Sequence, residues 1–538
     1  MTFSLSRRSL LGAAAGIGSL ATLGACSSST SGTNAAEDQQ KLQAALPNYI
    51  PYEGVTPDLA AELGRTAAGF IAYPETPVQF SKDAPGDGKP VTFMGPTSFG
   101  LPPAVADNPF WQEMNKQIGS DLEISLTPAG DYDAKFSTTV AGKSLPDAFY
   151  VGSMPSRPKF MASQTADLTE HLAGEAVSNY PGLASIPTDS WKECIFDGQI
   201  RAVPLNRGLV ALPSVLIRND LLTKSGIDRA DLTSYEKLRE ASKELTGGNR
   251  WAWADAPLGH LRRMLDIPLR WSMDNDTIGS TLLDERQQEA LEATRQLVAD
   301  KSVNPDASGT PASTRKQWFG GGSAVFMSDS FIAWFSLYVA NAGVEGLDIQ
   351  ALQISGMDGG VGTQEIPRPN AGFTAFNAKL GDRLPTLLRI ADWLAAPFGT
   401  QEYLLNKYGL EGRHYELKGS DPIPTARATE VNIGSLYLSD TARVIYSAGR
   451  QQTVKDAWNH QRTVTEKAVS DPTYGLYSET ASRKQNSLGG ELADVEADII
   501  HGRRPVSDWS AAAKKYLDDG GQQMITEYQQ AYEASAAR

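Results

Sequence analysis

The chain has 538 residues, with 49 Lys and Arg against 63 Asp and Glu, which gives a formal net charge of −14. An acidic chain repels nucleic acids and anionic lipid headgroups, so both are excluded as expected ligands. The length allows two or three domains with large cores, and only two cysteines, Cys26 and Cys194, exclude a Cys-based zinc site.

Residues 1–25 have the pattern of a secretory signal peptide. Arg7 and Arg8 precede an apolar run over 10–23, which is too short to stay in a bilayer as a helix. The sequence Leu-Gly-Ala-Cys that follows resembles a bacterial lipobox, in which Cys26 carries the lipid, and the paired arginines resemble a twin-arginine export signal. We therefore expect a lipoprotein, acylated with palmitate and held at the extracellular face of the cell membrane. The alternative is an ordinary signal peptide with a chance cysteine.

The mature chain is expected to begin with a flexible tether. Residues 26–45 are rich in Ser, Thr, Ala, Gly and Gln, a composition typical of a linker. After residue 23 no apolar run is long enough to cross a membrane, so the lipid is the only anchor that the sequence indicates. Cys194 is expected to be a buried, small apolar residue.

Short apolar runs alternate with helical patterns between residues 91 and 151. The expected strands are 91–94, 122–126 and 147–151, and the expected helices are 108–118 and 132–140. Asn108 and Pro109 are typical of a helix N-cap and of the first helical position. This alternation favours a parallel sheet covered by helices.

The rest of the chain continues the mixture of strands and helices. A strand is expected at 215–217, and helices are expected at 234–245, 284–300, 384–396 and 509–536. Thr233 and Glu236 have the spacing of a capping box at the first of these helices. Apolar residues recur on one face of the next two, and Pro397 ends the second of them.

Residues 197–204 resemble a known protein family. They read Asp-Gly-Gln-Ile-Arg-Ala-Val-Pro, similar to the Asp-Gly-Lys-Ile-Tyr-Gly-Ile-Pro of extracellular solute-binding proteins of ABC importers. Further similar stretches follow in the family's order at 216–228, 234–238, 303–306 and 319–327. Residues 408–416, Tyr-Gly-Leu-Glu-Gly-Arg-His-Tyr-Glu, resemble the large oligosaccharide-binding lipoproteins of this family. One departure is Arg201 in place of the usual Tyr, a ring that could stack on a sugar.

The resemblance implies an α/β, two-lobed fold of the type II periplasmic-binding-protein kind. Each lobe is a mixed sheet covered by helices, and the ligand cleft lies between the lobes. The expected division is 46–206 and 352–395 for the first lobe, and 207–351 and 396–538 for the second. The implied function is to capture a sugar or oligosaccharide by hinge closure and to deliver it to an ABC permease. The protein is expected to act as a monomer.

A sugar needs aromatic faces for its C–H surfaces and paired donors and acceptors for its hydroxyls. Three Trp-containing stretches combine such groups, and two polar residues follow the expected hinge strand. The candidate ligand contacts are Trp271, Trp253, Asn206, Arg207, Asp329 and Arg270. Trp271 is favoured, because the neighbouring Arg and Asp residues indicate a cleft wall. Trp393 falls on the periodic helix over 384–396 and is expected to be structural.

Motifs for catalysis or metal binding are missing from the sequence. The five histidines are scattered, and neither a His-Glu-x-x-His nor a Gly-x-Ser-x-Gly motif occurs. We therefore expect no catalytic residue, metal or other cofactor. Two alternatives stay open: an extracellular carbohydrate-active enzyme, hydrolase or lyase, with two catalytic carboxylates, and a binding protein for a peptide or siderophore.

The variant Cys26→Ala tests the lipid anchor. Without the thiol no lipid can be attached, so the variant should be released or kept as an uncut precursor. Membrane fractionation with mass measurement of the N-terminus checks this, and Cys194→Ala is the control that leaves the lipobox intact. A processed Cys26→Ala protein that still sediments with membranes would contradict the lipoprotein interpretation.

Overall fold

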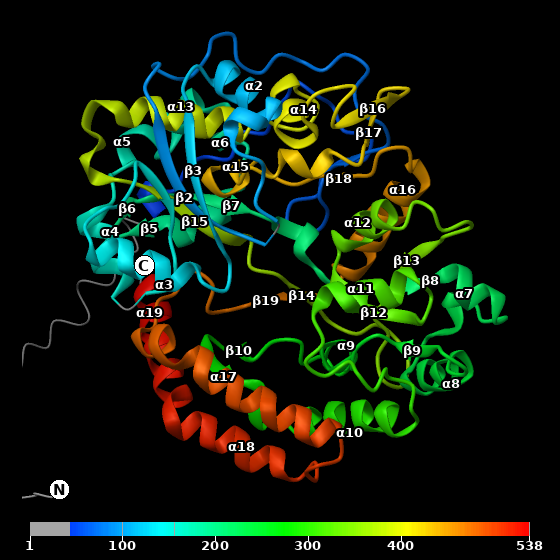
Figure 1. The fold of residues 1–538 in the computed structure, drawn as a ribbon. Helices are drawn as coiled ribbons and strands as arrows, with labels where there is room; N and C mark the ends of the chain where they lie inside the picture. Colours follow the sequence, from blue (N-terminus) through cyan, green and yellow to red (C-terminus); the bar gives the residue numbers. More distant parts are fainter. Residues whose placement is uncertain (1–42, 99, 155, 537–538) are drawn as a thin grey trace, which may run out of the picture.

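The computed structural model describes residues 43–536 except 99 and 155. The predicted signal peptide, Cys26 and most of the predicted tether lie outside the described residues. Within them the chain forms two α/β lobes, each built around its own sheet, with a group of C-terminal helices beside the second lobe (Figure 1). In this part of the chain no helix is long and apolar enough to cross a membrane.

The first lobe is built on a five-stranded mixed sheet in the order β3-β2-β4-β15-β7. Its strands are β2 (Val91–Thr97), β3 (Leu122–Pro128), β4 (Ala148–Tyr150), β7 (Ala202–Asn206) and β15 (Asn370–Phe376). β2 pairs in parallel with β3 and β4, whereas β15 runs antiparallel to β4 and β7. The three predicted strands between residues 91 and 151 are confirmed. β15 comes from much later in the chain, so the first lobe is discontinuous.

Local capping explains where two helices begin. The Asn108 side chain accepts a hydrogen bond from the Trp111 N–H at 3.2 Å, and α2 (Pro109–Ile118) starts with proline, as predicted. At α8 (Tyr235–Leu245) the cap is Ser234, whose hydroxyl accepts from the Lys237 N–H at 3.3 Å. The predicted capping box with Thr233 is therefore wrong by one residue.

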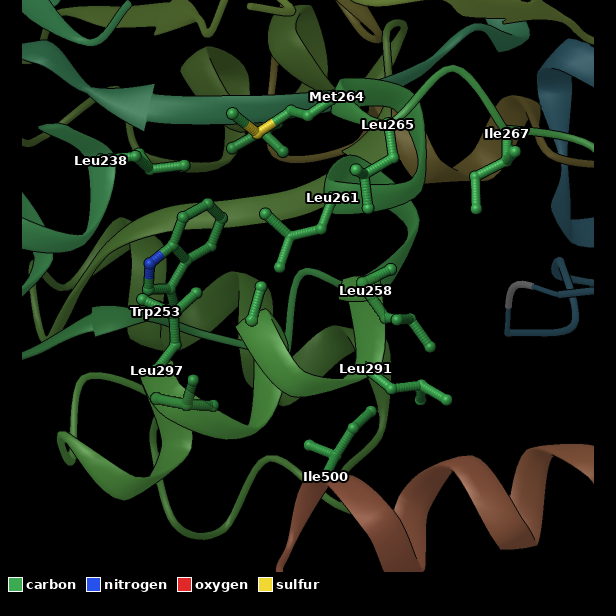
Figure 2. Close-up of a cluster of buried hydrophobic side chains, with 14 of the residues drawn as sticks. Leu238, Trp253, Leu258, Leu261, Met264, Leu265, Ile267, Leu291, Leu297 and Ile500 are labelled. Carbon is green, nitrogen blue, oxygen red and sulfur yellow. The ribbon is translucent and has the colours of Figure 1, made fainter. Parts of the chain in front are cut away.

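The second lobe contains a four-stranded sheet in the order β13-β8-β12-β9. Its strands are β8 (Pro213–Arg218), β9 (Trp251–Trp253), β12 (Ala324–Ser330) and β13 (Ile349–Ala351). Figure 2 shows part of its core, where Trp253 lies among Leu238, Leu261 and Leu297. The Trp253 ring stacks on Phe326 at 4.8 Å between centroids.

The C-terminal helices pack on the second lobe. They are α17 (Glu479–Ile500), α18 (Asp508–Tyr516) and α19 (Gln522–Ala536), and α17 packs on α10 (Arg286–Ala299) in Figure 1. Trp509 is buried against the lobe, and its indole N–H donates to the Leu282 carbonyl at 2.8 Å. The single helix predicted over 509–536 is interrupted at Leu517–Gly521, a π-helical turn that contains two adjacent glycines.

One segment differs from the predicted lobe division. Residues 396–538 were assigned to the second lobe, but α14 (Gln401–Tyr408) and α15 (Ser435–Leu438) pack on α13 (Leu384–Leu394) of the first. The Asn406 side chain donates to the Leu394 carbonyl at 3.1 Å, and Leu438 is buried in the first lobe's core. Only from Ile445, shortly before α16 (Gln451–Val464), does the chain join the core of the second lobe.

The N-terminal segment 47–80, here called the strap, contacts both lobes. Pro47 forms a β-bridge with Gly174 of the first lobe. The Ala67 N–H donates to the Gln461 side chain on α16 at 2.7 Å, and β1 (Gly69–Phe70) pairs with β18 (Ile445–Tyr446). The strap then returns to the first lobe, where the Phe80 N–H donates to Glu402 on α14 at 2.9 Å.

Asp392 is a buried carboxyl that caps a short helix. It lies on α13, is 9% exposed, and accepts hydrogen bonds from the Gly182 and Leu183 N–H groups at 2.7 and 3.0 Å. Burial raises the pKa of Asp392 from 3.8 to about 7, although these two hydrogen bonds oppose the rise. The folded protein therefore holds this proton more tightly than the unfolded chain does.

The variant Asp392→Asn should change how stability depends on pH. The raised pKa stabilises the fold below about pH 4, and that stabilisation is lost as pH rises to about 7, since the unfolded chain then releases the proton more readily. Asparagine keeps an acceptor oxygen without titrating. Urea unfolding at several pH values measures this. Between pH 4 and pH 8 the free energy of unfolding of the variant should rise by about 1–4 kcal/mol relative to that of the native protein. The exposed Asp494→Asn variant is the control, and equal pH dependence in all three proteins would contradict this assignment.

Candidate ligand-binding site

A cavity of about 720 Å³ lies where the two lobes and the strap meet. Its walls include Tyr52 and Phe70 of the strap and Asn206 at the end of β7. Arg368 and Arg443 come from later segments that pass between the two lobes. Two other hollows, of about 720 and 410 Å³, are each lined by one lobe alone. A volume of this size suits a small ligand, and hinge closure requires a ligand that touches both lobes. The cavity at the lobe junction is therefore the candidate site.

Main-chain hydrogen bonds position the hinge side of this cavity. The N–H groups of Arg207 and Gly208 both donate to the Pro369 carbonyl, at 2.7 and 3.0 Å. The Asn206 side chain donates to the Ser190 hydroxyl at 2.6 Å, and the Asn370 side chain donates to the Ser190 carbonyl at 2.7 Å. Two segments that cross between the lobes are thus held side by side at one end of the cavity.

Aromatic rings and polar groups share the cavity wall. Phe70 and Phe398 both line it, with ring centroids 4.4 Å apart. Tyr474 also lines it, and its hydroxyl donates to the Asp189 carbonyl at 2.9 Å. The combination of apolar rings with hydrogen-bonding groups is the one that a sugar requires.

A cluster of charges adjoins the cavity. The Asp440 carboxylate has no exposed surface and contacts three cations: Arg207 at 2.9 Å, Lys407 at 2.6 Å and Arg443 at 2.5 Å. Burial would raise the pKa of Asp440, but the three cations outweigh burial and hold that pKa below its ordinary value. Asp440 is therefore an anion within this group, here called the Asp440 cluster.

The six predicted contacts fall into two groups. Asn206 lines the cavity, and Arg207 stands beside it in the Asp440 cluster. The other four, which do not line this cavity, are Trp253 in the second lobe's core, Trp271 and Arg270 at β10 (Trp271–Asp274), and Asp329 near the end of β12, 3.2 Å from Lys316. Their roles in binding stay predictions.

Trp271 occupies a different environment from the predicted cleft wall. It is 4% exposed, belongs to the core cluster of the second lobe, and meets Tyr528 edge-on at 5.6 Å between centroids. Arg270 lies over the Tyr516 ring at 5.1 Å, so this pair joins the lobe to the C-terminal helices. Trp393, predicted to be structural, is buried in the first lobe's core.

Sequence reasoning missed several residues of the cavity. Arg368, Arg443 and Tyr474 line it from segments that carry no motif, and the predicted division places the whole strap in the first lobe. The aromatic residues of the strap at Tyr49, Tyr52 and Phe70 were the one available signal. Among the described residues, no three His, Cys, Asp or Glu side chains gather as a metal site. Cys194 is buried, as predicted, and burial raises the pKa of its thiol.

Comparison with known proteins defines the class of this fold. No family model matches the chain. The polygalacturonan/rhamnogalacturonan-binding protein YtcQ of Bacillus subtilis (strain 168) is 20% identical over 444 residues, which cover 78% of this chain and 87% of that protein. Lipoprotein LipO of the same organism is 20% identical over 486 residues, covering 85% and 94%.

Comparison with solved structures also finds similarity to solute-binding proteins. The alginate-binding protein AlgQ2 has a TM-score of 0.59 at 13% identity and covers 85% of this chain and all of its own. The N-glycan transport solute-binding protein NgtS of Streptococcus pneumoniae has a TM-score of 0.59 at 15% identity, covering 83% and 99%. The chain therefore has the type II solute-binding fold. The predicted resemblance to extracellular solute-binding proteins of ABC importers is confirmed.

The variant Trp271→Ala tests whether this ring belongs to the core. Removing a buried Trp leaves a cavity, so the free energy of unfolding should fall by about 3–5 kcal/mol. Denaturant unfolding measures the loss, and the partly buried Trp318 provides a control, since Trp318→Ala should lose less. Unchanged stability in Trp271→Ala would contradict the core assignment. A loss of ligand affinity in the folded variant would support the ligand contact predicted from the sequence.

Proposed function

We propose that this protein is a lipid-anchored, extracellular solute-binding protein that captures a sugar or oligosaccharide between its lobes. It then delivers the ligand to an ABC permease as a monomer. The observation that carries the proposal is the cavity of about 720 Å³, because its walls come from both lobes and from the strap. Closure of the lobes would enclose a ligand there and exclude water from it.

The relatives support sugar as the ligand class. YtcQ is named for binding polygalacturonan and rhamnogalacturonan, and AlgQ2 for binding alginate. A carbohydrate ABC transporter substrate-binding protein of Streptococcus pneumoniae is 29% identical over 133 residues, a quarter of this chain (24%). The aromatic and polar wall described above fits that class of ligand.

The catalytic alternative has less support at this site. The two carboxylates that line the cavity are Asp189, 2.7 Å from Lys192, and Asp471, 3.0 Å from Arg368. A glycosidase needs two carboxylates that face the scissile bond from opposite sides. Both carboxylates of this cavity are instead engaged in ion pairs along its wall, an arrangement that holds the wall in place.

A glycan panel read by thermal unfolding tests the proposed function. A ligand at about 100 times its dissociation constant stabilises the folded state by about 2.7 kcal/mol, which raises the melting temperature. Chromatography of the recovered ligand should show the same chain length before and after incubation. Shortened products would indicate an enzyme, and stabilisation by peptides or siderophores alone would contradict a sugar-binding function.

A further inference from the structure

The Asp440 cluster holds more positive than negative charge. One carboxylate faces three cations, Arg207, Lys407 and Arg443, so the four groups carry a net charge of +2. Within the described residues none of the three cations forms an ion pair with a second acid. The other charged groups at the cavity are balanced, since Lys192 pairs with Asp189 and Arg368 with Asp471.

Burial makes this excess charge costly. The side chains of Lys407, Arg207 and Arg443 are only 14%, 24% and 26% exposed. Burial and the charge of Arg443 lower the pKa of Arg207, and burial lowers the pKa of Lys407. Cations that are desolvated without a matching anion destabilise the fold, whereas an anion that binds among them removes that cost.

The cluster is placed where a ligand in the cavity can reach it. Arg443 lines the cavity, and so do Asn206 and Gly208 on either side of Arg207. The Nε–H of Arg443 is buried without a hydrogen-bond partner, so its guanidinium is not fully satisfied by the protein. The other titratable groups that face the cluster are phenols: Tyr403 and Tyr408 beside Arg443, and Tyr150 and Tyr437 beside Arg207.

We propose that the natural ligand is an acidic oligosaccharide, and that a uronate carboxylate binds at the Asp440 cluster through Arg443 and Arg207. This inference rests on the proposed function and names the class of sugar. Arginine presents a planar fork of donors that matches a carboxylate, and such charge-assisted hydrogen bonds are stronger than those to a neutral hydroxyl. The net charge of the whole chain is −14 and repels an anionic ligand, so a local excess of cations is needed for binding.

Matched pairs of acidic and neutral ligands test this proposal in the full chain. The probes are trigalacturonate, trimannuronate and a glucuronate-bearing xylotriose, each compared by calorimetric titration with its own carboxyl-reduced, neutral counterpart. At least one acidic member should bind about 10- to 100-fold more tightly than its neutral counterpart. Neutral sugars that bind as tightly as the acidic ones, or a chain that binds only neutral sugars, would overturn the inference and leave the proposed function intact. A protein that binds no sugar of either kind would overturn both.

The variant Arg443→Gln assigns the preference to the cluster. It should reduce the affinity ratio between the acidic ligand and its neutral counterpart by about tenfold, because one cation of the carboxylate site is lost. Arg295→Gln removes the same charge from an exposed pair with Glu292 and should leave the ratio unchanged. An unchanged ratio in folded Arg443→Gln would overturn the assignment. Melting curves establish folding, and if Arg443→Gln does not fold, the ratio measured on the native protein still decides between acidic and neutral ligands.

Discussion

The hinge is held by main-chain hydrogen bonds, and the candidate site depends on them. The N–H groups of Arg207 and Gly208 converge on the Pro369 carbonyl, which joins the exit from β7 to the approach to β15. Because both segments pass between the lobes at this point, their pairing fixes Asn206 and Arg368 on the cavity wall. Main-chain hydrogen bonds form with almost any side chains. The side chains that line the cavity can therefore change without altering the geometry of the hinge. Changes of φ and ψ in these few residues would move whole lobes.

The strap adds a constraint on that motion. Its first part is bonded to the first lobe through Pro47, its middle to α16 through Ala67, and its end to α14 through Phe80. Since the strap also forms one wall of the cavity, any change in the angle between the lobes must carry the strap with it or break these contacts. The exposed pair of Arg65 with Glu466 adds little, because solvent and salt weaken such pairs. The predicted tether precedes the strap in sequence, so the expected membrane anchor leads into the segment that contacts both lobes.

Local patterns in the sequence predicted the helices and strands well, but they predicted poorly what those helices and strands pack against. The cap at Asn108 and the strands of the first sheet follow from neighbouring residues, and both are confirmed. At α8 two adjacent hydroxyl residues could serve as the cap, and propensity alone does not separate Ser234 from Thr233. α14 gives no such local signal, because its buried residues are the polar Glu402 and Asn406, and the lobe on which it packs depends on distant parts of the chain. The cavity could not be predicted from the sequence, because its walls bring together residues more than 300 positions apart, such as Tyr52 and Arg443.

Trp271 shows why polar neighbours are a weak guide to a binding site. Trp271 starts a β-hairpin, and successive side chains of a strand point to opposite faces. Its polar neighbours can therefore face solvent while the ring enters the core, as its contact with Tyr528 shows. Arg207 is the opposite case, because it was predicted as a ligand contact only from its place after the expected hinge strand, and it lies in a buried group of charges that only the fold assembles.

An anion bound at the Asp440 cluster, as proposed, would favour closure of the lobes. Its members come from three places: Arg207 follows β7, Lys407 lies on α14, and Asp440 and Arg443 precede β18. Water weakens an ion pair much more than it weakens packing, so the attraction between these cations and an anionic ligand grows as closing lobes exclude solvent. A hydroxyl of a neutral sugar gains much less, because its hydrogen bonds with water are nearly as good as those it forms with the protein. A charged group placed beside the hinge therefore favours the closed form more than the open one, which is the differential affinity that a ligand needs in order to drive a conformational change.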